Sequence, residues 1–436
     1  MSLSVLSGLI ILVLLVIMLI AGVPIAVALG ISSVCAILPV MDLNVAVVTG
    51  AQRIFSGISV FSLLAIPFFI LAGNIMNKGG IAIRLINLAK IVTGRTPGGL
   101  AQTNILANAL FGAISGSGTA AASAMGSIIG PIEKDEGYDP NFFAAANIAT
   151  APTGLLIPPS NVMITFSLVS GGTSVAALFM AGYIPGALWA LACMLVVYIY
   201  AKKAGYRSQT KLTGKEKINA FIQALPCLLL IVIVIGGIIA GVFTATEGSV
   251  VAVVYSLLLS IYGYKSMKWK DLPEIFRSSA EMTGIIIFLI GVSSIMSWVM
   301  AFTNIPTMVS NGLLSISSNK YVILLMINII LLVVGTFMDM TPATLIFTPI
   351  FLPVCTALGM NTIHFGIMLI FNLCIGTITP PVGTTLFVGV KVGGVKIETV
   401  FKHLLPYFFA IIVVLMLVTY IPQLSLWLPG LMGYVS

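Results

Sequence analysis

The sequence predicts an all-α membrane protein that crosses the bilayer about ten to twelve times. The chain of 436 residues is 59% hydrophobic and only 7% charged, with a mean hydropathy of +1.17. Uninterrupted apolar runs such as 4–21 and 407–422 approach the roughly twenty residues that a helix needs to span a bilayer. Two distant apolar stretches, TGLLIPPSNVMITF (153–166) and TITPPVGTTLFVG (377–389), each contain an adjacent pair of prolines.

This composition excludes several other classes of protein. An average soluble domain is about 25% charged, so a soluble enzyme is excluded. The strands of a porin-like barrel alternate apolar and polar residues over about ten residues, whereas this chain has long uninterrupted apolar runs, so a porin-like barrel is excluded too. The net charge of +8 does not indicate nucleic-acid binding, because Lys and Arg gather between the apolar spans. We therefore expect membrane lipid, and no nucleic acid, around this chain.

The basic residues also predict the topology. The richest cluster lies in 202–217, which we interpret as a cytoplasmic connector. Counting spans outward from this connector places both termini outside, on the side of the membrane opposite to the cytoplasm. The run 4–21 lacks a positive segment before it, so we interpret it as an anchor, although AVALG (26–30) resembles a cleavage site. The basic residues predicted on the cytoplasmic side include Lys78, Arg84, Lys90, Arg95, Lys202, Lys203, Arg207, Lys211, Lys215, Lys217, Lys265, Lys268, Lys270, Arg277, Lys391, Lys396 and Lys402.

The two halves of the chain share landmarks in the same order. Gly112 precedes Pro158 by 46 residues, and Gly335 precedes Pro380 by 45. A pair of glycines follows each proline pair at the same distance. We therefore predict a first repeat over 1–201 and a second over 218–436. Because the first begins outside and the second begins inside, the repeats must be inverted, as in secondary transporters.

Each repeat is predicted to hold a re-entrant hairpin and a broken helix. The hairpins are the Gly-, Ser- and Thr-rich segments 100–130 and 335–359, which are too interrupted for a single span. The proline pairs break the spans 140–168 and 363–390. The outer spans of both halves would form a scaffold, and the hairpins and broken helices a transport domain. A close-packing face is the alternative interpretation of the Gly- and Ser-rich run.

The helix breaks predict an ion site made mainly of backbone atoms. A proline frees the carbonyl one turn earlier, and such a group is tolerated in a membrane only where it lines a cavity or is buried in protein. Freed carbonyls suit a small cation, and helix N-termini suit an anion. Proton-driven carriers commonly use carboxylates or histidines, but only Asp339 lies within a candidate site, where a capping role is an equal interpretation. Glu133, Asp135, Glu136 and Asp139 are assigned to a loop.

Sodium is therefore the predicted coupling ion, and no cofactor is expected. Five scattered cysteines and two isolated histidines lack the spacing of a transition-metal site. The sequence also shows no acid–base pair of the kind that an enzyme would use, so we do not expect an enzyme.

The hairpin GSGTA, with NIATAPTGLLIPPSN and GTITPPVGTTLFV, resembles the large membrane subunit of tripartite ATP-independent periplasmic (TRAP) transporters over essentially the whole chain. The resemblance implies a sodium-driven, elevator-type importer of an organic acid, of the sialic acid or C4-dicarboxylate type, in a bacterial inner membrane. It implies two partners: a small four-helix membrane subunit, expected as a separate chain, and a periplasmic protein that delivers the substrate.

The same resemblance implies particular site residues. Two sodium clusters are expected, one at each hairpin tip and the facing break, with substrate or tip contacts beside them. The first sodium cluster is Ser115, Ser117, Gly154, Ile157 and Pro159. The second is Gly335, Met338, Thr341, Gly376 and Thr379. The substrate candidates are Ser160, Asn161, Thr384 and Thr385.

One alternative to this function stays open, and two others are disfavoured. A stand-alone sodium/dicarboxylate symporter of the divalent-anion type shares hairpins and broken helices but needs no binding protein. A membrane scaffold would leave the paired breaks without a purpose. An intramembrane enzyme finds no supporting residues.

Overall fold

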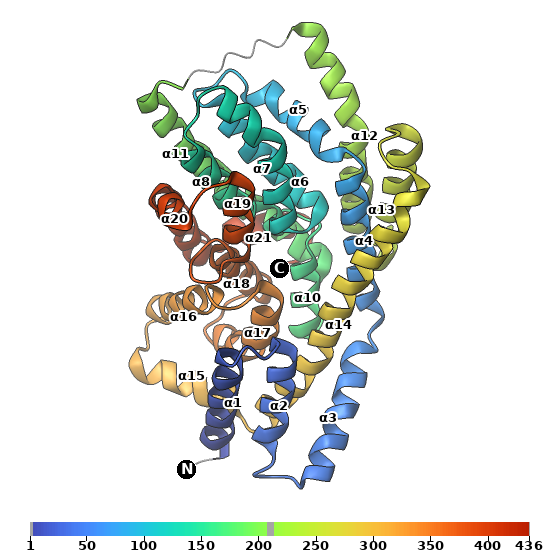
Figure 1. Cartoon of the computed structure of the whole chain (residues 1–436). Helices are drawn as coiled ribbons and strands as arrows, with labels where there is room; N and C mark the ends of the chain where they lie inside the picture. The colour runs from blue at the N-terminus through green and yellow to red at the C-terminus, as the bar shows by residue number, and fades with distance from the viewer. Residues whose placement is uncertain (1–2, 207–212, 436) are drawn as a thin grey trace.

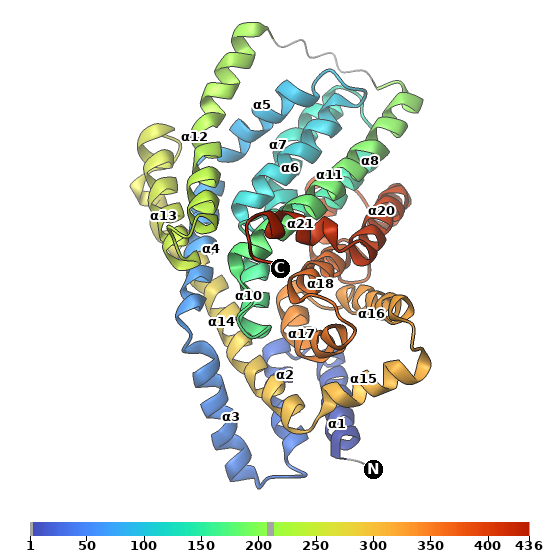
Figure 2. The same ribbon diagram turned by 180° about the vertical axis from the view of Figure 1, so that it is seen from behind.

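The structure, a computed structural model, describes residues 3–206 and 213–435 and is entirely helical over those residues (Figures 1 and 2). The predicted fold class is confirmed. The middle of the basic connector predicted over 202–217 lies outside the described residues, including Arg207 and Lys211. The described parts of this segment are the end of α11 and the start of α12.

The first half of the chain forms eleven α-helices and one short 3-10 turn. Side-chain caps begin α7, α8 and α11; for example, Asp139 accepts a hydrogen bond from the backbone N–H of Asn141 at the start of α8. The helices are α1 (Leu3–Ile20), α2 (Ile25–Ile37), α3 (Leu43–Ile58), η1 (Phe61–Leu64), α4 (Ala65–Lys78), α5 (Ile81–Thr93), α6 (Gly99–Ser115), α7 (Gly118–Asp135), α8 (Pro140–Thr150), α9 (Thr153–Leu156), α10 (Asn161–Val169) and α11 (Val175–Ala204).

The second half of the chain also consists of α-helices joined by short turns. Capping boxes begin α12 and α13, where Thr213 pairs with Glu216 and Thr244 pairs with Glu247. The elements are α12 (Gly214–Ile239), α13 (Ala245–Leu258), η2 (Leu259–Gly263), η3 (Trp269–Asp271), α14 (Leu272–Phe302), α15 (Ile305–Ile316), α16 (Lys320–Gly335), α17 (Met340–Ala357), α18 (Thr362–Thr377), α19 (Thr384–Gly393), α20 (Ile397–Tyr420) and α21 (Gln423–Leu431).

Corresponding helices of the two halves recur at an offset of 222 residues. This offset relates both ends of α7 to α17, and the starts of α8 and α11 to those of α18 and α20. The N-cap Asp139 corresponds to Asn361, whose side chain accepts a hydrogen bond from the N–H of Ile363. By the same offset α6 corresponds approximately to α16, so the second helix pair begins earlier than the predicted range 335–359. The assignment of inverted repeats stays a prediction.

Eight helices among the described residues are long and apolar enough to cross a membrane, or up to nine if the bent pair α8–α9 and α10 counts as one span. Five shorter apolar helices, including α16 and α18, accompany them. The expected ten to twelve spans therefore stay a prediction. The outer helices expose large apolar side chains, as surfaces that face lipid do; Ile20 at the end of α1 is 82% exposed.

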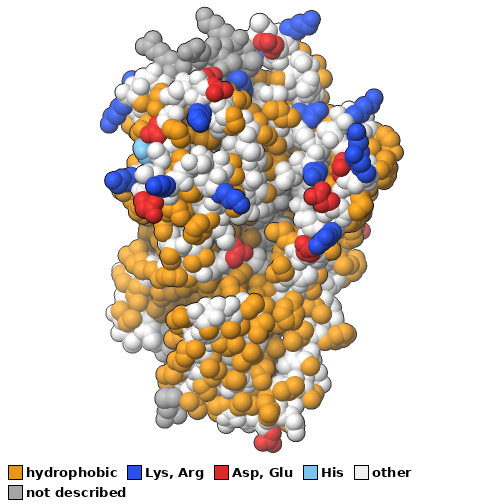
Figure 3. Space-filling view, in the orientation of Figure 1, with side chains coloured by type: hydrophobic (Ala, Val, Ile, Leu, Met, Phe, Trp, Pro, Cys, Tyr) orange, Lys and Arg blue, Asp and Glu red, His pale blue; other side chains and the backbone are white. Residues whose placement is uncertain are grey.

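The chain forms two groups of helices that lie side by side. In one group α4 packs against α13, and α14 packs against α2, α3 and α4. In the other, α6, α7, α8 and α11 lie in the upper part of the view, and α10 and α16 to α18 lie below them (Figure 1). The Lys and Arg side chains gather on the upper part of the molecule, whereas the lower part of the same face is largely hydrophobic (Figure 3).

Candidate functional site

The first helix break lies between α9 and α10. Ile157 and Ser160 have extended backbones, and the helices on either side are bent by 48°. Pro158 and Pro159 have no N–H, so the carbonyls of Gly154 and Leu155, four residues earlier, lose their helical partners. The break therefore arises directly from the proline pair, which is joined by a cis peptide bond.

Bare carbonyl oxygens remain at this break. Within the described residues, the carbonyls of Ile157 and Pro159 accept no hydrogen bond. The Ser160 hydroxyl is fully buried and has no partner, and Asn161 Oδ1 is also unpartnered. Buried polar groups are normally hydrogen-bonded, so these atoms can accept a ligand.

The second break repeats this arrangement between α18 and α19. Pro380 and Pro381 remove the N–H groups that would bond to the carbonyls of Gly376 and Thr377. Here the carbonyls of Gly376 and Thr379 accept hydrogen bonds from the N–H groups of Thr379 and Gly383, both at 3.1 Å. A carbonyl oxygen has two lone pairs, so each retains one for another ligand.

Each broken helix touches the nearest hairpin helix through a pair of glycines. A methyl group added at Gly154 would lie 2.1 Å from the Cα of Gly112 in α6. One added at Gly376 would lie 2.4 Å from the carbonyl oxygen of Gly335 in α16. Only residues without a side chain allow backbones to approach so closely. The structure thus brings the predicted carbonyl ligands of each break beside the facing helix pair.

Serines surround the turn between α6 and α7. Gly116 ends α6 with a φ of 62°, a conformation that favours glycine. Ser117 caps α7 by accepting a hydrogen bond of 3.3 Å from the N–H of Ala120, and its hydroxyl lies 3.0 Å from that of Thr119. The Ser115 hydroxyl is 3.4 Å from the Ser117 carbonyl. Both predicted serines therefore lie at one turn, which also faces Asn161.

The turn between α16 and α17 contains the other predicted ligands. The carbonyl of Met338 accepts no hydrogen bond within the described residues, because Pro342 lacks an N–H. The Thr336 carbonyl accepts a hydrogen bond of 3.2 Å from the N–H of Val382, which ties this turn to the second break. Asp339 is the N-cap residue of α17, but its side chain makes no capping hydrogen bond, although its carboxylate lies near the Thr384 hydroxyl. The role of Asp339 stays a prediction.

Contacts between the halves join the two breaks into one region. A methyl group at Gly118, the first residue of α7, would lie 3.3 Å from the Thr385 hydroxyl of α19. The helix α7 packs against α19, and α10 packs against α17. The predicted residues Thr385 and Asn161 thus face the first turn, and Thr384 faces the second. Among the substrate candidates, the side chains of Ser160 and Thr385 are buried, whereas those of Asn161 and Thr384 are partly exposed.

Buried amide networks support each broken helix, and the sequence analysis missed them. Asn108 Nδ2 donates to Asn104 Oδ1 at 2.6 Å and to Asn147 Oδ1 at 2.9 Å. In the second half, Asn372 donates to Asn328 at 2.6 Å, and Asn328 donates to Thr419 at 3.0 Å. The asparagines within apolar helices could have indicated these networks, because a side-chain amide inside a bilayer needs hydrogen-bond partners.

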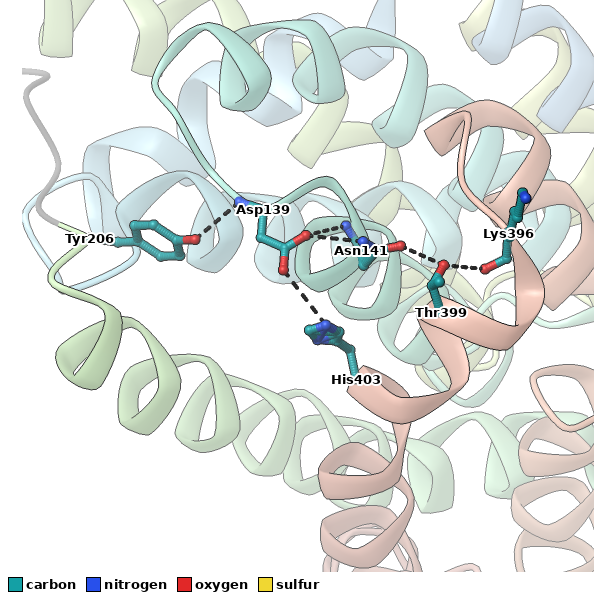
Figure 4. A network of polar contacts seen from close by, with 6 residues as sticks. All are labelled: Asp139, Asn141, Tyr206, Lys396, Thr399 and His403. Atoms are coloured by element: carbon teal, nitrogen blue, oxygen red, sulfur yellow. Dashed lines mark hydrogen bonds and ion pairs between the residues drawn. The ribbon is translucent and has the colours of Figure 1, made fainter.

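A separate polar network fixes the start of α8 (Figure 4). The Tyr206 hydroxyl accepts a hydrogen bond of 3.0 Å from the N–H of Asp139, and the Asp139 carboxylate lies 3.6 Å from His403 Nε2 in α20. Thr399 donates to Asn141 Oδ1 at 2.8 Å. This network holds α8 against α20 at the end remote from the break.

The site can hold a small cation with neutral oxygen atoms. Carbonyls and hydroxyls of this kind are ligands for hard cations. Among the described residues, no group of three or more His, Cys, Asp or Glu side chains could hold a metal ion. The acidic residues of the region are limited to Asp339.

Comparisons with known proteins identify the family. Residues 12–424 match the family model of the tripartite ATP-independent periplasmic transporter, DctM component. The YgiK protein of Salmonella typhimurium is 53% identical over 95% of both chains. The C4-dicarboxylate TRAP transporter large permease protein DctM of Rhodobacter capsulatus is 36% identical, covering 98% of this chain and all of the relative.

A third relative is longer than this chain. The isethionate TRAP transporter permease protein DctMQ of Oleidesulfovibrio alaskensis is 38% identical over 94% of this chain, which corresponds to 65% of the relative. Among solved structures, the YdaH transporter of Alcanivorax borkumensis has a similar fold, with a TM-score of 0.65 over the full length of both chains and 12% identity.

Proposed function

This chain belongs to the DctM component of the tripartite ATP-independent periplasmic transporters, and on this basis we propose that it imports an organic acid by sodium-coupled, elevator-type transport. Its family consists of large permease subunits rather than enzymes, and its relatives carry organic acids. The observation that carries the proposal is the pair of proline breaks, each beside a glycine contact to a hairpin helix. The first break has bare carbonyls, and the carbonyls of the second each keep one lone pair for another ligand.

Sodium coupling is supported by the oxygen atoms that could serve as ligands at each break. The first cluster combines the hydroxyls of Ser115 and Ser117 with the carbonyls of Gly154, Ile157 and Pro159. The second combines the Thr341 hydroxyl with carbonyls of Gly335, Met338, Gly376 and Thr379. A cation that joins a hairpin turn to a broken helix stabilises the contact between them, so sodium would order the region before substrate binds. The exposed amides at the starts of α10 and α19 would then favour the carboxylate of the substrate.

An elevator movement is supported by the division of the helices into two groups. The hairpin helices α6, α7, α16 and α17 and the broken helices share the contacts described above, so they would move as one transport domain. The group containing α2, α3, α4, α13 and α14 packs mainly within itself and would form the scaffold. A movement of one group against the other would carry both clusters together.

Two protein partners follow from the family. Large subunits of TRAP transporters work with a small membrane subunit and a periplasmic binding protein. The longer relative DctMQ is consistent with a small subunit joined to a large one. For this chain we propose a separate small subunit of four helices and a soluble protein that delivers an organic acid, of the C4-dicarboxylate or sialic acid type.

The protein is a multi-pass membrane protein, and we place it in a bacterial inner membrane. The gathering of Lys and Arg at the end that carries α5, α12 and the end of α11 supports a cytoplasmic assignment for that end (Figure 3). Both termini would then lie on the periplasmic side. Accessibility of single cysteines introduced near residues 3 and 435 to a membrane-impermeant reagent tests this topology.

Uptake by reconstituted components tests the function. Proteoliposomes containing this chain and its small subunit should accumulate the organic acid only when the binding protein and an inward sodium gradient are both present. Replacing sodium with potassium in the external medium should abolish uptake. Accumulation driven equally well by potassium would refute sodium coupling.

The same experiment separates the alternative function. A stand-alone sodium/dicarboxylate symporter would take up substrate without a binding protein or a small subunit. Family membership favours the tripartite system, so we expect this chain alone to give no uptake. Robust sodium-dependent uptake by the chain alone would favour the divalent-anion symporter type.

A further inference from the structure

One acidic residue lies in an unexpected environment. The sequence predicts a solvated loop for Glu133, but the structure places it in the last turn of α7, where it is only 1% exposed. Its neighbours along the same helix face, Ala122, Met125 and Ile129, are also buried. The side chain thus continues the apolar stripe of the helix rather than the charged run that follows it.

The Glu133 carboxyl has no partner for either oxygen. Neither Oε1 nor Oε2 makes a hydrogen bond, and none of the ion pairs among the described residues includes Glu133. A buried ionised carboxylate without a hydrogen bond or a counter-charge is far less favourable than a neutral acid. The surroundings therefore favour a bound cation, and the smallest is a proton.

A cavity of about 380 Å³ gives access to this residue. Its walls come from α7, from the start of α8 and from the end of α19, and they include Gly130, Tyr138 and Gly393. The cavity lies near the Lys- and Arg-rich end of the molecule, beside the network in Figure 4. Water in such a cavity can deliver or remove a proton.

Among the described residues, no positively charged group forms an ion pair with Glu133, although Lys134 lines the same cavity. Burial, followed by the Glu133 and Glu136 carboxyls, raises the pKa of Tyr138 in the adjoining loop. The Tyr407 hydroxyl of α20 is also buried and unpartnered, and it lies within electrostatic range of Glu133. The other titratable groups on this hairpin end and on the elements around it include Lys134, Asp135, Glu136, Asp139, Cys193, Tyr200, Tyr206, Lys391, Glu398, Lys402 and His403.

We propose that Glu133 is a proton-binding site of this permease, reached through the cavity at the base of the first hairpin and separate from the sodium clusters. In the protonated form the neutral acid packs with the end of α7 against α8 and α19. When water in the cavity removes the proton, the resulting carboxylate attracts water and loosens that packing. The site therefore makes the base of the hairpin sensitive to pH on the Lys- and Arg-rich side.

Infrared difference spectroscopy of the purified full-length chain in lipid nanodiscs tests this proposal directly. A change from about pH 5 to about pH 9 should remove the carbonyl band of a protonated carboxylic acid, with its midpoint above the ordinary range of an exposed glutamate. The band should be missing in Glu133→Gln, which is uncharged and similar in shape. It should persist in Asp135→Asn, the matched control, because Asp135 is exposed in the same turn.

Two results would overturn the proposal. The first is an identical spectral change in the wild-type protein and in Glu133→Gln. The second is loss of the band on adding sodium at constant pH, which would make Glu133 a sodium ligand. Hydrogen exchange provides a second measurement: protection at the end of α7 should fall at alkaline pH in the wild type but not in Glu133→Gln measured at the same pH. Neither measurement depends on transport, so each is independent of the proposed import function.

Discussion

Gly154→Ala is the sharpest perturbation of the first sodium cluster. The added methyl group would lie 2.1 Å from the Cα and carbonyl carbon of Gly112, whereas ordinary contacts begin at 3.4 Å. The broken helix and α6 must therefore separate by about 1.3 Å along this direction, because both atoms met belong to backbone. Overpacking of this kind costs about 1–3 kcal/mol.

The effect on sodium should exceed the effect on folding. Cation coordination tolerates changes in ligand distance of only about 0.2 Å, so a shift of this size removes a ligand from the first cluster. We expect the sodium concentration for half-maximal uptake to rise by about tenfold or more, which corresponds to about 1.4 kcal/mol of binding free energy. The assay is initial uptake in proteoliposomes at a series of sodium concentrations, together with the shift in melting temperature that sodium causes in the purified chain.

Gly284→Ala is the matched control. Gly284 lies inside α14, and a methyl group there would meet nothing within 4 Å. This variant should keep the sodium response of the wild type and gain up to about 1 kcal/mol of helix stability. If Gly154→Ala and Gly284→Ala responded to sodium alike, the first break would not be part of a sodium site.

Further substitutions extend the test. Gly376→Ala should weaken the second cluster in the same way, because its methyl group would lie 2.4 Å from the Gly335 carbonyl oxygen; a sodium titration of uptake measures this, and an unchanged titration contradicts it. Phenylalanine at Ser115 or at Thr341 should abolish uptake without preventing membrane insertion, as measured by transport and by the amount of protein in the membrane; undiminished uptake would remove these residues from the site. Asn147→Leu should lower the free energy of unfolding by about 1–3 kcal/mol, since Asn108 loses a buried partner, and a thermal melt equal to that of the wild type would contradict this. Asp139→Ala should cost about 1 kcal/mol through loss of the cap on α8, whereas Asp135→Ala, which alters an exposed side chain, should cost little in the same melt.

The proline pairs made much of the fold predictable. A proline lacks an N–H wherever it lies, so Pro158 and Pro380 indicated interrupted helices without any knowledge of packing. The regular spacing of the landmarks also pointed to a duplication, and the helices do recur at one constant offset. Hydrophobic composition was sufficient to predict an all-helical membrane protein.

Other features depend on contacts that a single sequence does not record. The close approach of Gly112 to Gly154 depends on the relative positions of two helices. The sequence shows that both residues are glycines but not that they meet. The correspondence of α16 to α6 is one of position in the chain and not of composition, because α16 is strongly apolar whereas α6 is more polar. Glu133 was assigned to a loop because charged residues follow it. Its spacing from Ile129, one helical turn earlier, places it instead on the buried face of α7.

The central claim is that the two proline breaks hold sodium with main-chain oxygens. The most direct test is a density map of the purified transporter in sodium, compared with one in potassium, at a resolution that shows bound ions. The account predicts a sodium-specific peak within coordination distance of the Gly154 and Ile157 carbonyls and the Ser115 hydroxyl, with a second beside Gly335 and Gly376. Identical maps in the two salts, with the carbonyls of both breaks bonded only to water or protein, would contradict it.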